Sequence, residues 1–322
     1  LKYRLFRWAV LFVTLAAISF AVYREAQESA LQSTFFSTLA AKFRWDVHPG
    51  ANPDLWLPQE GPYDHRLGYA RLGEMLPRLA DARYAITAQA KQSEEFLEAV
   101  QRGFYPIYRE KSQAGLSLFD RNGLVLQTSR FPQRQYTSFE EIPRVLVDAL
   151  LYVENRDLLS PDFPRRNPAV DWGRFARAAI GQGVRLIDGE GSRAGGSTLA
   201  TQIEKFRHSP GGRTHGSGDK LRQMVSASLR AYLDGEETLD ARRRIVRDYL
   251  NSVPLAAAPG YGEVHGGNIG VMIDDAYQRT DKRRHLDSKG AKRKTVDIMA
   301  SACSLFALGL LCYGGVVNVL QT

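Results

Sequence analysis

The sequence predicts a mainly α-helical protein with one small β-hairpin, placed behind an N-terminal transmembrane helix. Three observations support this fold class. An uncharged apolar run lies near the start, an Asn-Gly pair separates two short apolar runs near the middle, and stretches with apolar residues at helical spacing follow. The chain has 322 residues, 44% of them hydrophobic, so it can bury the core of one large domain or two ordinary ones.

Residues 8–23 form the predicted transmembrane anchor, and residues 1–7 the cytoplasmic N-terminus. The run from Trp8 to Tyr23 carries no charge. It is slightly shorter than the roughly 20 residues that cross a bilayer, but apolar residues at positions 5 and 6 extend it. Basic residues precede it, which predicts that the rest of the chain is outside the cytoplasm. A cleaved signal peptide is the alternative, and the lack of a clear small-residue cleavage site favours the anchor.

Residues 24–112 are predicted to be a membrane-proximal helical region. The segment Ser93–Val100 has helical character, and a loop rich in proline and glycine, from His48 to Pro62, interrupts the region. No pattern that carries chemistry lies within it. We therefore expect a spacer or a membrane-proximal domain.

From Gly115 onward the pattern changes. The turn Asp120-Arg-Asn-Gly123 lies between two apolar runs, which predicts a hairpin. After Pro143 the spacing becomes helical, with Leu146, Leu150 and Val153 on one face. Four more helices are predicted, the first capped by Asp171. Their apolar markers are Trp172, Phe175 and Ala179, then Leu199, Ile203 and Phe206, then Leu221, Met224, Val225, Ser228, Leu229 and Tyr232, and finally Ile245, Val246, Tyr249 and Leu250.

Residues 271–322 form an atypical tail. The stretch from Gln278 to Lys294 is dense in charged residues, and the stretch from Ile298 to Val317 is uncharged and apolar. The second stretch fits a further membrane segment. It fits equally well a sequence translated in the wrong reading frame, and the sequence leaves both explanations open.

Composition narrows the partners and cofactors. The formal charge of +8 suits an anionic partner, and the absence of zinc-finger spacing and of an RNP-type motif argues against nucleic acid. The two cysteines, Cys303 and Cys312, both lie in the tail, and the six histidines are scattered without a pair at helical spacing. The sequence therefore predicts no metal site held by side chains.

Three segments carry residues suited to chemistry. Glu154 ends an apolar helix, where partial desolvation can make a carboxylate a base; an exposed helix-end glutamate is the plain alternative. Gly195-Gly-Ser-Thr198 leads into a helix and can present backbone N–H groups to an anion, with Lys205 further along; an ordinary N-cap is the alternative. Two later helices carry basic residues that we expect outside the buried apolar stripes. These residues either add positive charge to a binding site or form an ordinary solvated face. These basic residues are Lys220, Arg222, Arg242, Arg243 and Arg247.

The order of these segments resembles the peptidoglycan glycosyltransferase family, family 51, over about residues 115–266. The motifs that carry the resemblance are, in order, Asp120-Arg-Asn-Gly123, Ile142-Pro143, Glu154, Gly195-Gly-Ser-Thr198 with Gln202, Lys220 and Tyr249-Leu-Asn251. Gly-x-Ser-Thr and Tyr-Leu-Asn are the most specific of these motifs. The resemblance implies that residues 113–270 form a lysozyme-like helical glycosyltransferase domain, on the outer face of the bacterial inner membrane.

The same resemblance implies a reaction and its residues. The family joins lipid-linked disaccharide units with inversion at the anomeric carbon. Glu154 matches the glutamate that takes the proton from the acceptor's 4-hydroxyl, and Lys205 and Arg213 match cations that hold the departing diphosphate-lipid. Cations aimed at a leaving diphosphate stabilise the charge that grows in the transition state. Ser197, Thr198 and Gln202 would line the cleft, and Lys220 would extend its cationic side. The resemblance leaves open a divalent cation, and other cell-wall synthesis proteins as partners.

The sequence also departs from the family's pattern. Asn155 replaces an aspartate, Leu158 a phenylalanine and Gln223 a second carboxylate, and an insertion spans Pro161 to Asn167. An amide cannot move a proton as a carboxylate can. Three hypotheses follow: a divergent polymerising transferase with Glu154 as base, a non-catalytic cell-wall scaffold that binds precursor or partners, and a glycan-cleaving enzyme with Glu154 as acid. The glycine-led and Tyr-Leu-Asn motifs disfavour the last.

Overall fold

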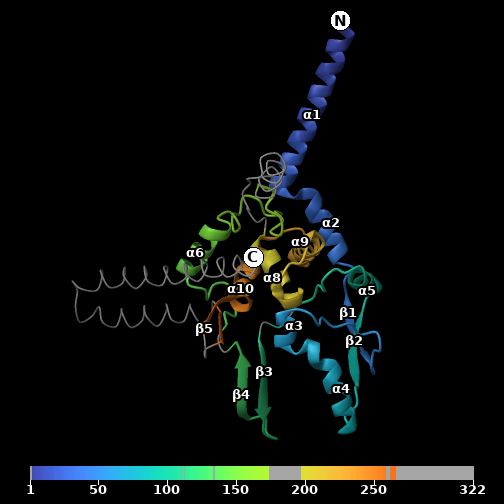
Figure 1. The fold of residues 1–322 in the computed structure, drawn as a ribbon, viewed down its shortest axis with the longest axis vertical. Coiled ribbons are helices and arrows are strands. Elements are labelled where there is room, and N and C mark those ends of the chain that lie inside the picture. The colour runs from blue at the N-terminus through green and yellow to red at the C-terminus, as the bar shows by residue number, and fades with distance from the viewer. Residues whose placement is uncertain are drawn as a thin grey trace, which may run out of the picture.

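A computed structural model describes residues 2–109, 111, 113–132, 135–173, 197–258 and 262–265. Helix α1 (Lys2–Glu28) projects away from the rest of the molecule (Figure 1). Its segment Phe6–Glu28 is long and apolar enough to cross a membrane, and none of its apolar window is buried. The predicted anchor, residues 8–23, lies inside this helix.

The chain kinks at Ser29, between α1 and α2 (Ala30–Ala40). Ser29 has the left-handed backbone angles φ 53° and ψ 37°, which interrupt the straight helix. Its hydroxyl is buried and accepts a hydrogen bond of 3.1 Å from the backbone N–H of Asn167. The Asn167 amide in turn donates to Gln32 (3.1 Å) and to Ser228 (2.9 Å). The end of the predicted insertion is therefore bonded to the foot of α1.

The membrane-proximal region is less helical than predicted. It contains β1 (Trp45–Pro49), α3 (Pro62–Leu67), the short 3₁₀ helix η1 (Tyr69–Arg71), α4 (Leu72–Asp81), β2 (Ala88–Gln92) and α5 (Glu94–Gln101). Strands β1 and β2 pair antiparallel. Every residue of β1 is exposed, so the strand lacks the alternation by which a sequence reveals one. The predicted helix at 93–100 is confirmed, and Ser93 caps α5 by accepting from the N–H of Phe96 at 3.3 Å.

Gly61 brings the membrane-proximal region against the following helical domain. It precedes α3, and a Cβ placed on it would lie 1.6 Å from the backbone oxygen of Arg207 in α8 (Leu199–His208). Only a residue without a side chain permits this contact. Asp64 of α3 supports the junction, because its carboxylate lies 3.1 Å from Nδ1 of His208 and accepts from the N–H of Gly61.

The predicted hairpin is confirmed as β3 (Ala114–Phe119) and β4 (Val125–Phe131). The Asp120 carboxylate accepts from the backbone N–H groups of Asn122 and Leu124, both at 2.8 Å, and Gly123 has the positive φ that the turn needs. Every residue of β4 is exposed. The hairpin and α4 lie at the end of the molecule opposite to α1 (Figure 1).

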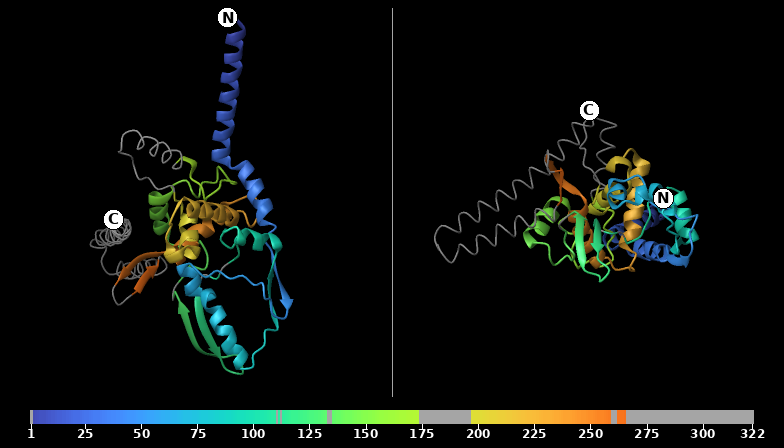
Figure 2. Two further views of the ribbon diagram at one scale, coloured as in Figure 1. Left: turned by 45° about the vertical axis from the view of Figure 1, so that its right-hand side comes forward. Right: turned by 90° about the horizontal axis from the view of Figure 1, so that it is seen from below.

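The core of the helical domain is built by α6 (Arg144–Glu154), α8 (Leu199–His208), α9 (Ser217–Ala231) and α10 (Leu239–Ser252). These helices lie between α1 and the hairpin (Figure 2). The main cluster joins apolar residues of α6, α8 and α10 with residues of α3 and of the segments that flank these helices. Its central members are Tyr63, Leu146, Leu150, Leu199, Ile203, Phe206, Val246, Tyr249 and Leu250. The mainly α-helical fold class is therefore confirmed.

Three residues that the sequence places on apolar helix faces are exposed, the first of them Trp172 at 37%. Val153 is 52% exposed, because the buried stripe of α6 runs through Leu146, Val147, Leu150 and Leu151 and turns Val153 away from it. Leu221 is 60% exposed in the second turn of α9, where the buried residues begin two positions later.

Other predictions lie partly or wholly outside the described residues. Helical backbone begins at Trp172, directly after the predicted cap Asp171, but Phe175 and Ala179 are not described. A third antiparallel pair, β5 (Pro254–Ala258) with β6 (Gly262–His265), ends the described chain. The described residues thus include three two-stranded sheets, of which the sequence predicted only the hairpin at 114–131. The tail, residues 271–322, lies outside the described residues.

Candidate active site

Glu154 lies where three helices meet. It is the last residue of α6 and is half-buried. Its Oε2 accepts a hydrogen bond of 3.2 Å from the side-chain amide of Gln202, in the first turn of α8. The amide oxygen of Gln202 accepts a bond of 3.3 Å from the hydroxyl of Tyr249 in α10. The structure therefore joins a residue of each of three sequence motifs in one hydrogen-bonded row.

Lys205 lies one turn after Gln202 on α8 and is half-buried. Burial lowers the pKa of its ammonium group below the ordinary lysine value, and the negative charge of Glu154 partly opposes this shift. The carboxylate and the ammonium group are therefore close enough to influence each other. Gln202 thus bonds to the proposed base, and the proposed cation lies one turn further along the same helix.

Thr198 is the N-cap of α8 and is buried. Its hydroxyl accepts from the N–H of Thr201 at 3.3 Å, and the Thr201 hydroxyl accepts from the N–H of Thr198 at 2.8 Å. These two bonds form a reciprocal cap that fixes the start of the helix. Ser197, directly before it, is exposed. Gly195 and Gly196 lie outside the described residues. Thr198 thus supports the helix that carries Gln202 and Lys205.

Arg213 lies on the segment that joins α8 to α9, and Lys220 lies at the start of α9. Arg213 is exposed and follows the short 3₁₀ helix η2 (Pro210–Gly212). Lys220 is half-buried in the first turn of α9. Both cations are on the chain immediately after the helix that carries Lys205.

Gln223 is 3% exposed and holds this connecting segment in place. Its amide nitrogen donates to the hydroxyls of Ser209 and Thr214, each at 3.0 Å, and its amide oxygen lies 3.2 Å from the Thr214 hydroxyl. The Ser209 hydroxyl also bonds to that of Tyr105 at 2.8 Å. The hydroxyl groups and the amide of this cluster satisfy one another's hydrogen bonds. Gln223, at the position of the family's second carboxylate, is therefore part of a neutral hydrogen-bonded network.

Arg242 corrects a prediction, because it lies in the core and not on a basic outer face. It is 0% exposed, and its guanidinium donates to the backbone oxygens of Leu158 (3.0 Å), Ser160 (3.1 Å) and Phe163 (3.0 Å), with Pro164 at 3.4 Å. The irregular segment before and within the insertion has carbonyl groups that no helix or strand satisfies. Arg242 supplies their donors.

The remaining motif residues are structural. The Asn155 side chain accepts from the N–H of Asp157 at 3.1 Å in a tight turn after α6, and Leu158 is buried in the main core. Asn251 exchanges two hydrogen bonds with the backbone of Tyr136, at 2.9 Å and 2.8 Å. The family's Tyr-Leu-Asn motif thus places one residue at the site and uses another to fix the segment before α6.

A buried ion pair behind α8 was not predicted. Arg230 of α9 donates to the Glu204 carboxylate at 2.6 Å and to the backbone oxygens of Tyr108 and Pro106. Glu204 is 1% exposed. The two residues lie 26 positions apart on different helices, so no spacing rule could pair them. The pair fixes α9 and the membrane-proximal region against the helix that carries Gln202 and Lys205.

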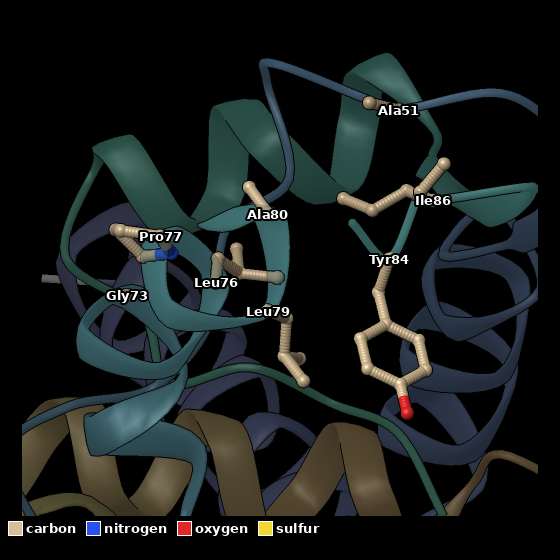
Figure 3. A pocket seen from close by; sticks show the side chains of 9 residues that line it. Ala51, Gly73, Leu76, Pro77, Leu79, Ala80, Tyr84 and Ile86 are labelled. Atoms are coloured by element: carbon tan, nitrogen blue, oxygen red, sulfur yellow. The ribbon is translucent and has the colours of Figure 1, made fainter. Parts of the chain in front are cut away.

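An apolar pocket lies away from this site. It has a volume of about 520 Å³, and side chains of α4 face Tyr84 and Ile86 across it (Figure 3). Its lining residues are Ala51, Gly73, Leu76, Pro77, Leu79, Ala80, Tyr84, Ala85 and Ile86. None of them carries a carboxylate or a cation, so the pocket lacks the charged groups of the candidate site. Within the described part of the chain, no three His, Cys, Asp or Glu side chains gather as a metal site.

The fold and the site define a helical domain in which a half-buried carboxylate meets an amide and an ammonium group, an arrangement suited to proton transfer beside an anionic leaving group. A family model described as transglycosylase matches residues 122–269. This segment, just under half of the chain, is similar to that family, as the resemblance to peptidoglycan glycosyltransferases predicted. The match is consistent with the predicted lysozyme-like fold. No curated protein matches the chain.

Proposed function

We propose that this protein polymerises peptidoglycan glycan chains from lipid-linked disaccharide units. The observation that carries the proposal is the meeting of Glu154, at the end of α6, with Gln202 and Lys205 of α8 inside a transglycosylase-family segment. A base and a cation within electrostatic reach are what an inverting transfer with a diphosphate leaving group requires.

In the proposed reaction the 4-hydroxyl of the acceptor sugar attacks the anomeric carbon of the donor from the face opposite to the diphosphate. The new C–O bond forms as the bond to the diphosphate breaks, and that bond's electron pair leaves on the phosphate oxygen. Glu154 accepts the hydroxyl proton. Lys205 stabilises the negative charge that develops on the diphosphate, and Arg213 and Lys220 extend the cationic side. Ser197 and Gln202 line the cleft in this proposal, and the buried Thr198 acts only as the cap of the helix that carries Gln202.

The proposal also places the protein at a membrane. α1 has the length and hydropathy of a membrane-spanning helix, and a lipid-linked substrate resides in a bilayer. We infer a single-pass anchor in the bacterial inner membrane, with the catalytic domain outside the cytoplasm. The lipid-linked precursor, the membrane and other cell-wall synthesis proteins are the partners of this proposal.

A second function has one specific observation in its favour. Gln223 stands where the family has a carboxylate, and its amide is buried in a neutral hydrogen-bonded network. A protein that keeps the fold without turnover would act as a membrane-bound scaffold or precursor-binding protein. The scaffold predicts binding of the precursor without product.

The deciding experiment is polymerisation of labelled lipid-linked disaccharide by the full chain in detergent. Glu154→Gln should lower the rate by about two to four orders of magnitude, the usual contribution of a general base. Glu140→Gln, which removes an exposed carboxylate just before α6, is the matched control and should leave the rate unchanged. Tight binding of the labelled precursor with no product from the unaltered protein would favour the scaffold.

A further inference from the structure

The row Tyr249–Gln202–Glu154 has a direction. The Tyr249 hydroxyl donates to the amide oxygen of Gln202 at 3.3 Å, and the amide nitrogen of Gln202 donates to Oε2 of Glu154 at 3.2 Å. We propose that Tyr249 is a positioning residue of the site: acting through Gln202, its hydroxyl fixes the orientation of the Glu154 carboxylate. The expected effect on turnover rests on the proposed function. The orientation of the Glu154 carboxylate through Gln202 does not.

The chemistry of the amide explains why a hydroxyl is needed at the far end. A glutamine side chain has a donating end and an accepting end, and rotation by half a turn exchanges them. In the rotated state the amide oxygen would face the negatively charged carboxylate, and the two would repel. A hydroxyl that donates to the amide oxygen stabilises the orientation in which the N–H group faces Glu154.

The positions of the three residues make this orientation stiff. Tyr249 is 3% exposed, and its ring lies in the main core with Leu250 and Val246. Gln202 is in the first turn of α8, which the cap between Thr198 and Thr201 fixes. The row therefore links the carboxylate to the rigid interior, as a preorganised site requires.

The bond from the Gln202 amide helps to hold the Glu154 carboxylate in one orientation toward the acceptor hydroxyl. Without the donor on the amide oxygen, Gln202 samples both orientations and the carboxylate loses its fixed position during part of the time. The expected consequence is slower turnover with little change in substrate affinity, because the Tyr249 side chain is buried in the core.

Tyr249→Phe tests this inference, because it removes the hydroxyl and keeps the buried ring. We expect kcat to fall about three- to tenfold, the rate equivalent of one neutral hydrogen bond, with KM for the lipid-linked disaccharide unchanged. Tyr232→Phe is the matched control: its buried hydroxyl donates to the backbone oxygen of Arg165 at 2.7 Å, so its loss should lower the unfolding temperature and leave kcat unchanged.

Gln202→Met completes a double-mutant cycle. Met has no amide, so Tyr249→Phe should add no further loss in the Gln202→Met background if the hydroxyl acts through Gln202. Full additivity of the two losses, or an unchanged kcat in Tyr249→Phe, would overturn the inference while leaving the proposed function in place.

A spectroscopic arm separates this inference from the proposed function. The full-length protein is labelled with ¹⁵N-glutamine and studied by NMR. The side-chain amide signals of Gln202 are assigned as those that disappear in Gln202→Met. They should move or broaden in both Tyr249→Phe and Glu154→Gln, and stay in place in Tyr232→Phe. If the unaltered protein makes no glycan product, the proposed function fails, but these signals still test whether Tyr249 orients the Gln202 amide. Signals unchanged in Tyr249→Phe would overturn the positioning role.

Discussion

The guanidinium of Arg242 donates a hydrogen bond of 3.0 Å to the backbone oxygen of Leu158, in the segment that follows Glu154. The same group satisfies backbone oxygens as far along as Pro164. A buried arginine of α10 therefore holds the start of the insertion against the core. The insertion is a supported part of the domain and not a loose loop.

Replacing Arg242 should destabilise the protein strongly. Arg242→Met keeps much of the volume but leaves several buried carbonyl groups without donors, so we expect the free energy of unfolding to fall by at least about 2 kcal/mol. Urea unfolding followed by circular dichroism measures this loss. Arg243→Met is the matched control, because Arg243 is exposed and pairs with Asp240 at the surface; its loss should stay under about 0.5 kcal/mol. Equal losses in the two variants would contradict the buried role.

The activity should depend on alkaline pH through Lys205. Burial lowers the pKa of this group below its ordinary value of 10.5, so the folded protein releases the proton before the unfolded chain does. The cation is lost as pH rises through the lowered pKa, and the rate should fall there. Lys205→Arg keeps the charge at alkaline pH. We therefore expect the alkaline fall in kcat/KM to occur at higher pH in this variant. Lys91→Arg, an exposed site on β2, serves as the control, and superimposable profiles for Lys205→Arg and the unaltered protein would count against Lys205.

The same shift has a consequence for stability. Between the lowered pKa and 10.5 the unfolded chain binds more protons at this position than the folded protein does. The contribution of Lys205 to the free energy of unfolding is therefore fully present above pH 10.5, the ordinary pKa of the group. This contribution is lost as pH falls through the lowered pKa. The charged, active state of Lys205 is thus the one that the fold disfavours.

Restoring a carboxylate at position 223 should weaken the fold. Gln223→Glu removes the donor to Ser209 and Thr214 and buries an acid, so we expect a loss of about 1–3 kcal/mol at neutral pH. Burial raises the pKa of such a carboxyl, so the loss should shrink as pH falls through that raised value. Urea unfolding at about pH 5 and about pH 8 tests both points. Gln127→Glu, exposed on β4, is the control. Faster turnover at undiminished stability would mean that this position retains a catalytic role.

Local sequence patterns predicted those elements whose determinants are themselves local. The uncharged run, the Asp120-Arg-Asn-Gly123 turn and the Ser93 cap each specify their structure within a few residues. Leu199, Ile203 and Phe206 were correctly predicted as buried, because one-sided burial follows helical spacing directly.

The features that escaped prediction depend on residues far apart in the chain. The bond between Tyr249 and Gln202 joins positions 47 apart on different helices. Arg242 carries a charge on an amphipathic helix, a pattern typical of a solvated face, and its burial follows from carbonyl groups on an irregular segment. The family resemblance identified Glu154 and Lys205 as residues of one site, but only packing of α6 against α8 brings their side chains together.

The exposed strands of β3 and β4 have a consequence for the order in which the protein opens. Both faces of this ribbon carry exposed apolar side chains, including Leu116, Phe119 and Leu126, so little more than its own ladder and turn holds it closed. A two-stranded ribbon without a packed face is marginally stable in water. Its amide protons should therefore exchange with deuterium through local opening, well before those of α8 and α10, whose exchange reports on the unfolding of the whole domain.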